Sequence, residues 1–323
     1  MLPDIFSIKT FEEFEEAAQA VFRMQYNHNP VYRAFCDLLN KNPADILTVK
    51  DIPFLPVSFF KTHTVIHENQ SAQQVFTSSG TTGMRTASHH VADISVYEKS
   101  FLKGFEYFYG SPKDYIIIAL LPSYLERQGS SLIYMMDRLI HETAHSESGF
   151  YLNEYDLVAE KLQRLDGGEK KILLVGVTFA LLDLVESHRF SLKNTIVMET
   201  GGMKGRRKEL IREELHEILK KGFGVKTIHS EYGMTELLSQ AYSKDDGIFA
   251  CPPWMQVHTR DVRDAMTLTP GQSGGINVID LANYNSCSFL ATQDLGKTYL
   301  DGTFEVLGRF DNSDVRGCNL LLL

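Results

Sequence analysis

The chain of 323 residues has no long apolar run, no block of basic residues and no closely spaced pair of cysteines. A membrane-spanning helix needs about 18–20 consecutive apolar residues, and no stretch reaches that length. Its 32 lysine and arginine residues are dispersed and its net charge is −9, which disfavours nucleic acid as a partner. The start, Met1–Asp4, lacks the basic and apolar parts of a signal peptide. We therefore expect a cytoplasmic protein with no membrane span.

Four cysteines are spread over the chain, at Cys36, Cys251, Cys287 and Cys318. None belongs to a CxxC pair, so a zinc site or a framework of disulfides is not expected. The first three fit small core or surface positions. Cys318 differs because it lies near the end of the chain, directly after Arg316 and Gly317, where a mobile tail could carry a reactive thiol.

Short apolar runs alternate with helical patterns through the middle of the chain. The expected strands cover 115–121, 171–177, 195–198 and 225–228, and the expected helices cover 11–26, 31–39, 130–141, 178–184 and 206–221. This alternation predicts an α/β fold, a mostly parallel sheet with helices on both faces. From about Cys251 onward, pieces such as 275–279, 288–291 and 303–307 predict a small β subregion. Ligands of such sheets bind beyond the carboxyl ends of the strands, which fall after Val177, Met198 and Ile228.

One short loop is rich in hydroxyl groups and glycine and has no charge. Glycine lets the backbone approach a ligand closely, and N–H groups and hydroxyls can wrap an anion. We therefore interpret this loop as a phosphate-binding loop, although runs of this kind also make ordinary turns and linkers, and the decision depends on the motifs that follow. Its residues are Thr77, Ser78, Ser79, Gly80, Thr81, Thr82 and Gly83.

Four segments in order along the chain resemble the motifs of the adenylate-forming superfamily, which includes acyl-CoA synthetases, luciferases and peptide-synthetase adenylation domains. The first is the phosphate loop at 78–83. The second is Tyr-Gly-Met-Thr-Glu at 232–236, and the third is Thr-Gln-Asp-Leu-Gly at 292–296, where Gln293 replaces a glycine. The fourth is Gly-Arg-Phe-Asp at 308–311. The usual Pro and Lys after the phosphate loop are missing, and whether Arg85 replaces that lysine is left open.

The resemblance implies ATP as the cofactor and assigns nucleotide contacts. The phosphate loop would hold the β and γ phosphates, and Gly201 and Gly202 would lie against the adenine. Tyr232 and Gly233 would flank the base. Asp294 would accept hydrogen bonds from the ribose hydroxyls.

Three residues are expected to act in the chemistry itself. Thr235 would contact the α-phosphate, and Arg309 would stabilise its developing charge. Glu236 would bind Mg²⁺, which prefers oxygen ligands and bridges to phosphate. Alternatively, Glu236 could cap a helix beginning at Leu237.

The length and ending of the chain are similar to those of the acyl-protein synthetase family, the ATP-using subunit of the bacterial bioluminescence fatty-acid reductase complex. The superfamily's usual C-terminal domain would follow Asp311, and only twelve residues do. In this family a cysteine near the C-terminus accepts the acyl group as a thioester, and Cys318 is the matching position. The expected division is an adenylation domain over 1–307, with the β subregion from about 251, and a hinge and cysteine-bearing tail over 308–323.

The expected function is therefore ATP-dependent activation of a carboxylic acid, in the first place a fatty acid, and its transfer to Cys318. The implied protein partner is an acyl reductase or an acyltransferase. Two alternatives stay open: an acyl- or aryl-CoA ligase similar to phenylacetate–CoA ligases, and a degenerate domain that binds nucleotide as a scaffold.

For several further residues, the sequence does not decide between a place in the wall of the substrate pocket and a place in the core. His89, His90 and His229 could face the acyl pocket or act as a general base. The residues at 177–179 could line an acyl tunnel or belong to the core.

Overall fold

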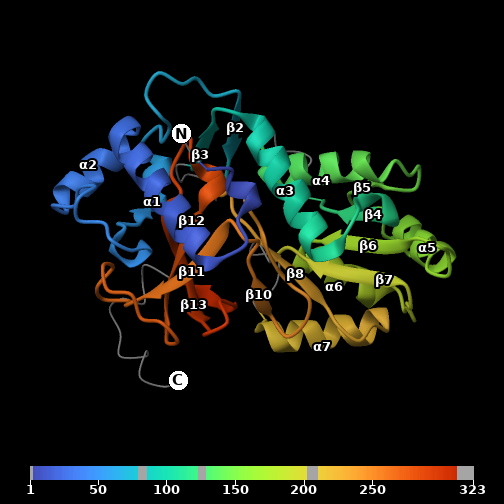
Figure 1. Cartoon of the computed structure of the whole chain (residues 1–323). Coiled ribbons are helices and arrows are strands. Elements are labelled where there is room, and N and C mark those ends of the chain that lie inside the picture. The colour runs from blue at the N-terminus through green and yellow to red at the C-terminus, as the bar shows by residue number, and fades with distance from the viewer. Residues whose placement is uncertain (1–2, 79–85, 123–128, 202–209, 311–323) are drawn as a thin grey trace.

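The computed structural model describes residues 3–78, 86–122, 129–201 and 210–310. Within these residues, twelve strands form one sheet in the order β11-β12-β13-β14-β10-β9-β8-β7-β6-β4-β5, with β1 paired to β13, and β2 and β3 form a separate hairpin. The sheet has a parallel half at one end and an antiparallel half at the other (Figure 1). Among the described helices, none is long and apolar enough to cross a bilayer.

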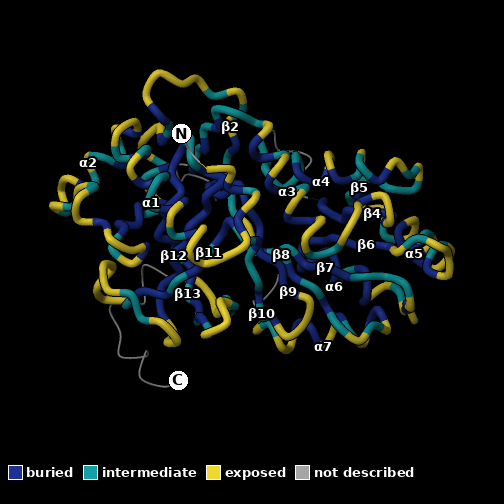
Figure 2. The backbone as a smooth tube through the Cα atoms, viewed as in Figure 1, coloured by how far each residue is buried: buried dark blue, intermediate teal, exposed yellow. Residues whose placement is uncertain are grey.

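The parallel half is an α/β layer. Its strands are β4 (Tyr115–Leu120), β5 (Gly149–Tyr151), β6 (Lys171–Gly176), β7 (Thr195–Glu199) and β8 (His229–Tyr232). All neighbouring pairs among them run parallel. β4 and β6 are almost wholly buried (Figure 2), as their continuous apolar sequences predict.

Helices cover both faces of this parallel half. On one side lie α3 (Ile94–Tyr109) and α4 (Ser131–Thr143), and on the other lie α6 (Thr178–Ser187) and α7 (Arg212–Phe223), while α5 (Tyr155–Leu165) lies near the outer edge (Figure 1). The predicted α/β class and its two-sided helical cover are confirmed.

The antiparallel half contains the strands that follow β8. They are β9 (Ala241–Ser243), β10 (Ile248–Ala250), β11 (Met255–Arg260), β12 (Ser273–Asp280), β13 (Phe289–Thr298) and β14 (Phe304–Arg309). Antiparallel pairing begins between β8 and β9 and continues through β10, β14, β13 and β12 to β11. The short β1 (Leu55–Pro56) joins β13 in parallel. The separate hairpin consists of β2 (Gln74–Thr77) and β3 (Ser88–Val91).

The first two helices pack on the antiparallel half. α1 (Phe11–His28) begins with a capping box between Thr10 and Glu13, and α2 is Pro30–Leu38. Buried Gln25 donates to the backbone oxygens of Asn283 and Tyr284. Asn29 donates to the Ser286 oxygen. These amide side chains satisfy buried carbonyl groups, so they fix α1 to the segment between β12 and β13.

Two boundaries of the sequence prediction are wrong. The strand expected at 225–228 is His229–Tyr232, because Gly224 ends α7 in the left-handed conformation and the next residues only lead back to the sheet. The helix expected from 206 begins at Arg212, and Ile211, placed in its apolar stripe, is its N-cap and 69% exposed. The positions 202–209 lie outside the described residues.

Candidate functional site

The loops that follow β6, β7 and β8 meet at one edge of the sheet. Thr200 donates its backbone N–H to the Gly176 oxygen, and Thr178 donates to the Gly201 oxygen. These bonds tie the loop after β7 to the end of β6. The carboxyl edge of the parallel strands is therefore one continuous surface, as the strand order predicts.

Asp294 is the point where three motif segments meet. Its Oδ2 accepts a hydrogen bond of 2.8 Å from the Tyr232 hydroxyl, and its Oδ1 lies 3.4 Å from Arg309 Nε. The register of β13 and β14 places Asp294 opposite Arg309. Burial raises the pKa of Asp294, opposed by the Tyr232 bond and the Arg309 charge. Strands β8, β13 and β14 thus deliver a tyrosine, a carboxyl and a guanidinium to one place.

Gln293, which stands where the superfamily has glycine, does not displace Asp294. Its backbone oxygen accepts a hydrogen bond from the Phe310 N–H, so pairing with the end of β14 continues past Arg309. The glycine that the backbone requires is Gly296, where an added Cβ would lie 2.3 Å from the Glu305 oxygen. The motif therefore keeps its geometry despite the substitution.

Tyr232 contacts Asp294 with its hydroxyl and the core with its ring. The ring packs edge-on against Phe304 and Phe249, with centroids 5.5 and 6.0 Å away. Tyr232 is 9% exposed. The structure therefore assigns it a role in holding Asp294, while its contact with adenine stays a prediction.

Arg260, which the sequence prediction missed, lies behind Asp294. Its guanidinium donates to the backbone oxygens of Ile276 and Thr292 and to Asn277 Oδ1. Its charge acts to lower the Asp294 pKa. Arg260 is the last residue of β11 and belongs to no sequence motif. Only the pairing of the strands brings it close to Asp294.

Glu236 is a buried carboxyl close to the same cluster. It is 7% exposed, and burial raises its pKa to about 7, opposed by the charges of Lys61 and Arg309. The alternative that Glu236 caps a helix is wrong, because the residues from Gly233 to Gln240 form turns that lead into β9. Without a helix to cap, its side chain is available for another partner.

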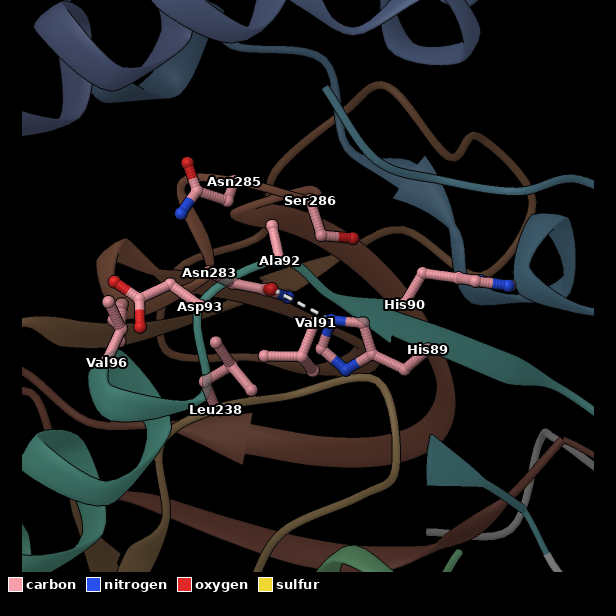
Figure 3. A pocket seen from close by; sticks show the side chains of 11 residues that line it. His89, His90, Val91, Ala92, Asp93, Val96, Leu238, Asn283, Asn285 and Ser286 are labelled. Carbon is pink, nitrogen blue, oxygen red and sulfur yellow. Dashed lines mark hydrogen bonds between the residues drawn. The ribbon is translucent and has the colours of Figure 1, made fainter. Parts of the chain in front are cut away.

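His89 holds the backbone on either side of Glu236 in place. Its Nδ1 lies 2.8 Å from the Thr235 oxygen and its Nε2 lies 3.0 Å from Asn283 Oδ1 (Figure 3). Asn283 in turn donates to the Glu236 and Cys287 oxygens. Burial lowers the pKa of His89 to about 4, although the two oxygen neighbours favour the protonated ring. His89 is fully buried by these contacts, which makes it a positioning residue rather than an exposed base.

The other histidines of the sequence analysis are placed apart from this bond network. His229 is the first residue of β8, and its Nδ1 lies 3.1 Å from the Tyr109 hydroxyl. His90 follows His89 in β3 and, with Asn285 and Ser286, lines a small cavity that has room for about one water (Figure 3).

The ends of the predicted phosphate loop are fixed by the β2–β3 hairpin. Ser78 N–H donates to the Ala87 oxygen, and Ala87 N–H donates back to Ser78 Oγ. Thr77 N–H donates to the Gly129 oxygen. The remaining loop residues, Ser79, Gly80, Thr81, Thr82 and Gly83, lie outside the described residues, as does Arg85.

Gly201 has the backbone conformation that favours glycine. Its φ is +70°, and a Cβ added there would meet nothing within 4 Å. Its N–H donates to Glu199 Oε2, whose carboxyl lies 3.9 Å from both Arg212 and His216. The open space fits the predicted approach of a flat base, which stays a prediction; Gly202 lies outside the described residues.

The three described cysteines are free thiols in low-polarity surroundings. Burial raises the pKa of Cys36 to about 12 and also raises those of Cys251 and Cys287. Since the thiolate is the nucleophile, none of these is prepared to attack an acyl group. Cys318, Arg316 and Asp311 lie outside the described residues.

An apolar cavity adjoins the carboxyl edge of the parallel strands. It has room for about one water, its exposed wall is apolar, and Thr200 and Glu231 lie beside it with apolar side chains of α4, β6 and β7. Those side chains are Met135, Met136, Leu139, Leu173, Val175 and Met198. Val177 and Phe179 are not among them, and both are buried in the core.

The fold is shared with adenylate-forming ligases. The chain aligns over 94% of its length with 72% of a 2-hydroxyisobutyryl-CoA ligase solved in an open conformation with 2-HIB-AMP and CoA, with a TM-score of 0.68 and 14% identity. It also matches ATP-bound MatB from Rhodopseudomonas palustris, with a TM-score of 0.55 and 18% identity over 73% of this chain and 47% of that one. The chain therefore has the fold of the adenylate-forming ligases.

The sequence comparisons narrow this class to a family. A family model described as acyl-protein synthetase, LuxE, matches residues 9–323. The long-chain-fatty-acid–luciferin-component ligase of Vibrio harveyi is 22% identical over 326 residues, which cover 94% of this chain and 85% of that protein. The chain belongs to the acyl-protein synthetase family LuxE. The predicted family, the enzyme class and the ATP-dependent formation of an acyl-adenylate are confirmed.

Proposed function

We propose that this chain joins a fatty acid to AMP, releases pyrophosphate, and transfers the acyl group to Cys318 for delivery to a protein partner. In the first step a carboxylate oxygen attacks the α-phosphorus of ATP and the bond to pyrophosphate breaks. In the second step the thiolate attacks the acyl carbon and AMP leaves. The observation that carries the proposal is the meeting of Tyr232, Asp294, Arg309 and Glu236 at one edge of the sheet.

The nucleotide would lie across the ends of β7 and β8 and the middle of β13, where Asp294 stands. Asp294, held by Tyr232, would accept hydrogen bonds from the ribose hydroxyls. Arg309 is 70% exposed at its side chain, and an exposed ion pair contributes little stability. Its guanidinium can therefore turn from Asp294 to the α-phosphate, where Thr235 would also bind. The phosphate loop from Thr77 to Gly83 and the two glycines at 201 and 202 would complete this nucleotide site.

Glu236 would hold Mg²⁺. Mg²⁺ commonly uses one or two carboxylates together with phosphate oxygens, so a single buried carboxyl fits, and within the described part of the chain there is no larger group of metal-ligating side chains. When bound, the ion neutralises phosphate charge as pyrophosphate leaves. A pKa near 7 means that Glu236 loses a proton readily when a cation arrives.

Cys318 would be the acyl acceptor. The three described cysteines have raised pKa values, which leaves the tail thiol as the candidate nucleophile, with Arg316 available to favour its thiolate. This assignment keeps the proposed division into an adenylation domain over 1–307 and a hinge and tail over 308–323. Asp311 would absorb the backbone rotation that brings the tail to the adenylate.

The acid would place its chain at the cavity between α4 and the parallel strands, which has room for about one water and would have to widen to admit the chain. The cavity wall is mainly apolar, as an aliphatic chain requires. The name of the Vibrio harveyi relative supports a long-chain fatty acid and a second protein component. The partner would be an acyl reductase or an acyltransferase that removes the acyl group from the thioester.

The test is labelling with a radioactive fatty acid in the presence of ATP and Mg²⁺, with the full chain as wild type, Cys318→Ser and the control Cys251→Ser. We expect label that hydroxylamine removes on wild type and on Cys251→Ser, and none on Cys318→Ser. Pyrophosphate release by Cys318→Ser should continue, because adenylation precedes thioester formation. Equal labelling of Cys318→Ser would contradict the assignment of the thiol.

A CoA ligase is the second candidate, because the fold matches a ligase solved with CoA. The same assay separates the two by adding CoA. Formation of acyl-CoA at an unchanged rate by Cys318→Ser would favour the CoA ligase. Nucleotide binding without pyrophosphate release for any acid would instead favour the scaffold.

A further inference from the structure

Lys61 is a positively charged residue to which the proposed reaction gives no role. It is the last residue of the short 3₁₀ helix η3 (Val57–Lys61) and is partly buried. Within the described part of the chain, its side chain forms no ion pair and no hydrogen bond. A charged group that is partly removed from water without a partner costs free energy, so a ligand of opposite charge would stabilise it here.

The pairing of β1 directs η3 along β13 toward Asp294. β1 runs parallel to β13, with Pro56 beside Ala291, so the chain leaves β1 in the direction in which β13 proceeds to Asp294. η3 begins directly after Pro56 and packs against both β13 and β3. Lys61 at its end therefore lies on the two strands that border the nucleotide site.

Phe60 fixes the end of η3 against the residue that supports Thr235. Its ring is 1% exposed and packs edge-on against the ring of His89, with the centroids 5.5 Å apart. His89 Nδ1 in turn lies 2.8 Å from the Thr235 oxygen. Lys61 therefore follows a buried anchor in the chain, and that anchor contacts the support of the Thr235–Glu236 backbone.

The charge of Lys61 reaches the carboxyl group of Glu236. It lowers the pKa of Glu236, and it does so more strongly than the charge of Arg309. Because no ion pair joins Lys61 to Glu236, the two groups are close enough to interact without being in contact. A ligand with several negative charges can therefore bind the ammonium group directly and the carboxylate through Mg²⁺.

The phosphate chain of ATP is the ligand that fits these neighbours. β3, against which η3 packs, begins directly after Ala87, and the bonds between Ala87 and Ser78 close the base of the predicted phosphate loop. Lys61 thus lies against the strand that leaves this loop, and its charge reaches the proposed metal ligand. Lysine commonly binds phosphate as a point charge.

We propose that Lys61 is a catalytic residue that binds the phosphates of ATP which leave as pyrophosphate. This inference rests on the proposed function. When the carboxylate oxygen of the acid attacks the α-phosphorus, the bond from that phosphorus to the bridging oxygen breaks, and its electron pair stays on the pyrophosphate. The Lys61 ammonium group donates a hydrogen bond to this departing group and keeps its proton. The interaction becomes stronger as charge develops, so it lowers the barrier.

The experiment measures the exchange of pyrophosphate into ATP that depends on tetradecanoic acid, with Mg²⁺ and the full chain. We expect Lys61→Met to lower kcat about 10²-fold and to raise KM for pyrophosphate about tenfold or more, with KM for tetradecanoic acid unchanged. Lys61→Arg should recover most of kcat, because it keeps the charge. Lys50→Met is the matched control, since it changes an exposed lysine of the short helix η2 (Val49–Asp51). It should leave all of these constants unchanged.

The value of KM does not depend on how much of a variant is folded, so KM for pyrophosphate separates binding from a loss of stability. A normal exchange rate in Lys61→Met overturns the inference alone, as does a rise in KM for the acid in place of that for pyrophosphate. Arg85→Met overturns it too if that variant, and not Lys61→Met, raises KM for pyrophosphate. A wild type without acid-dependent exchange refutes the proposed function as well.

Discussion

The two halves of the sheet contribute different things to the site. The parallel half, β4 to β8, provides the cavity and the loops at its carboxyl edge. The antiparallel half provides Asp294 and Arg309 from β13 and β14, and Asn283 from the segment between β12 and β13. The ordinary rule for α/β sheets locates a binding edge, but here Asp294 and Arg309 reach that edge from antiparallel strands.

Strand β8 lies between the two halves of the sheet and brings their side chains together. β8 is parallel to β7 on one side and antiparallel to β9 on the other. Tyr232, the last residue of β8, reaches across to Asp294 of β13. One side chain therefore links the two halves at the place where the nucleotide is proposed to bind.

Removing the metal-binding carboxyl should break the site most severely. Glu236→Gln should lower the rate of pyrophosphate release about 10²–10³-fold. The amide has no negative charge with which to hold Mg²⁺ beside the phosphates of ATP. In wild type the rate should fall as pH decreases through about 7, where Glu236 becomes protonated. Raising the Mg²⁺ concentration should move that midpoint to lower pH.

The control for this change is Glu217→Gln, an exposed glutamate of α7 paired with Lys220. It should leave both the rate and the pH profile unchanged. A Glu236→Gln variant with normal pyrophosphate release would show that the metal is held elsewhere.

Substituting Asp294, which the antiparallel half provides, should reduce activity less than substituting Glu236. Asp294→Asn should lower kcat/KM for ATP about 10–100-fold, since hydrogen bonds to a charged group contribute about 1.5–3 kcal/mol. Tyr232→Phe should lower it less than tenfold, because Asp294 remains and loses only one neutral donor. Initial rates over a range of ATP concentrations measure both.

The control for Asp294→Asn is Asp301→Asn, which changes an aspartate of an exposed turn that bonds Thr303. If Tyr232→Phe were as damaging as Asp294→Asn, the tyrosine would have a direct contact with the nucleotide in addition to its bond with Asp294.

The smallest effect on activity is expected for the backbone support of Glu236. Asn283→Ala removes the partner of His89 Nε2 and of two backbone oxygens, so the free energy of unfolding should fall by about 2–4 kcal/mol. The rate at a temperature where the variant is folded should fall only severalfold. Chemical denaturation and initial rates, with Asn285→Ala as the control, separate the two effects. A loss of activity as large as that of Glu236→Gln would make this network part of the chemistry.

Much of the fold and the site could be predicted where local chemistry decides. Continuous apolar runs gave β4 and β6 within one residue of their ends, and the capping residue Thr10 marks the start of α1. The strand ending at Tyr232 was expected four residues too early, because the β-branched residues near Val225 have strand propensity without a partner strand beside them. The helix expected after Glu236 fails for a similar reason, since Asn283 and the turn toward β9 hold that backbone.

The residues that support the site could not be predicted. Arg260 and Asn283 belong to no motif, and His89 gave no signal beyond its place near the phosphate loop. Each acquires its role from a partner far away in the chain, as His89 does from Thr235 and Asn283.

The sequence by itself determined the class of fold, the order of the four motifs and the family, because apolar periodicity and short motifs are local properties. The tertiary structure alone decided that Asp294 meets Tyr232 and Arg309, and that His89 meets Thr235 and Asn283. Those outcomes depend on strand register and on burial. Both are set by the packing of distant segments, and no short stretch of sequence contains them.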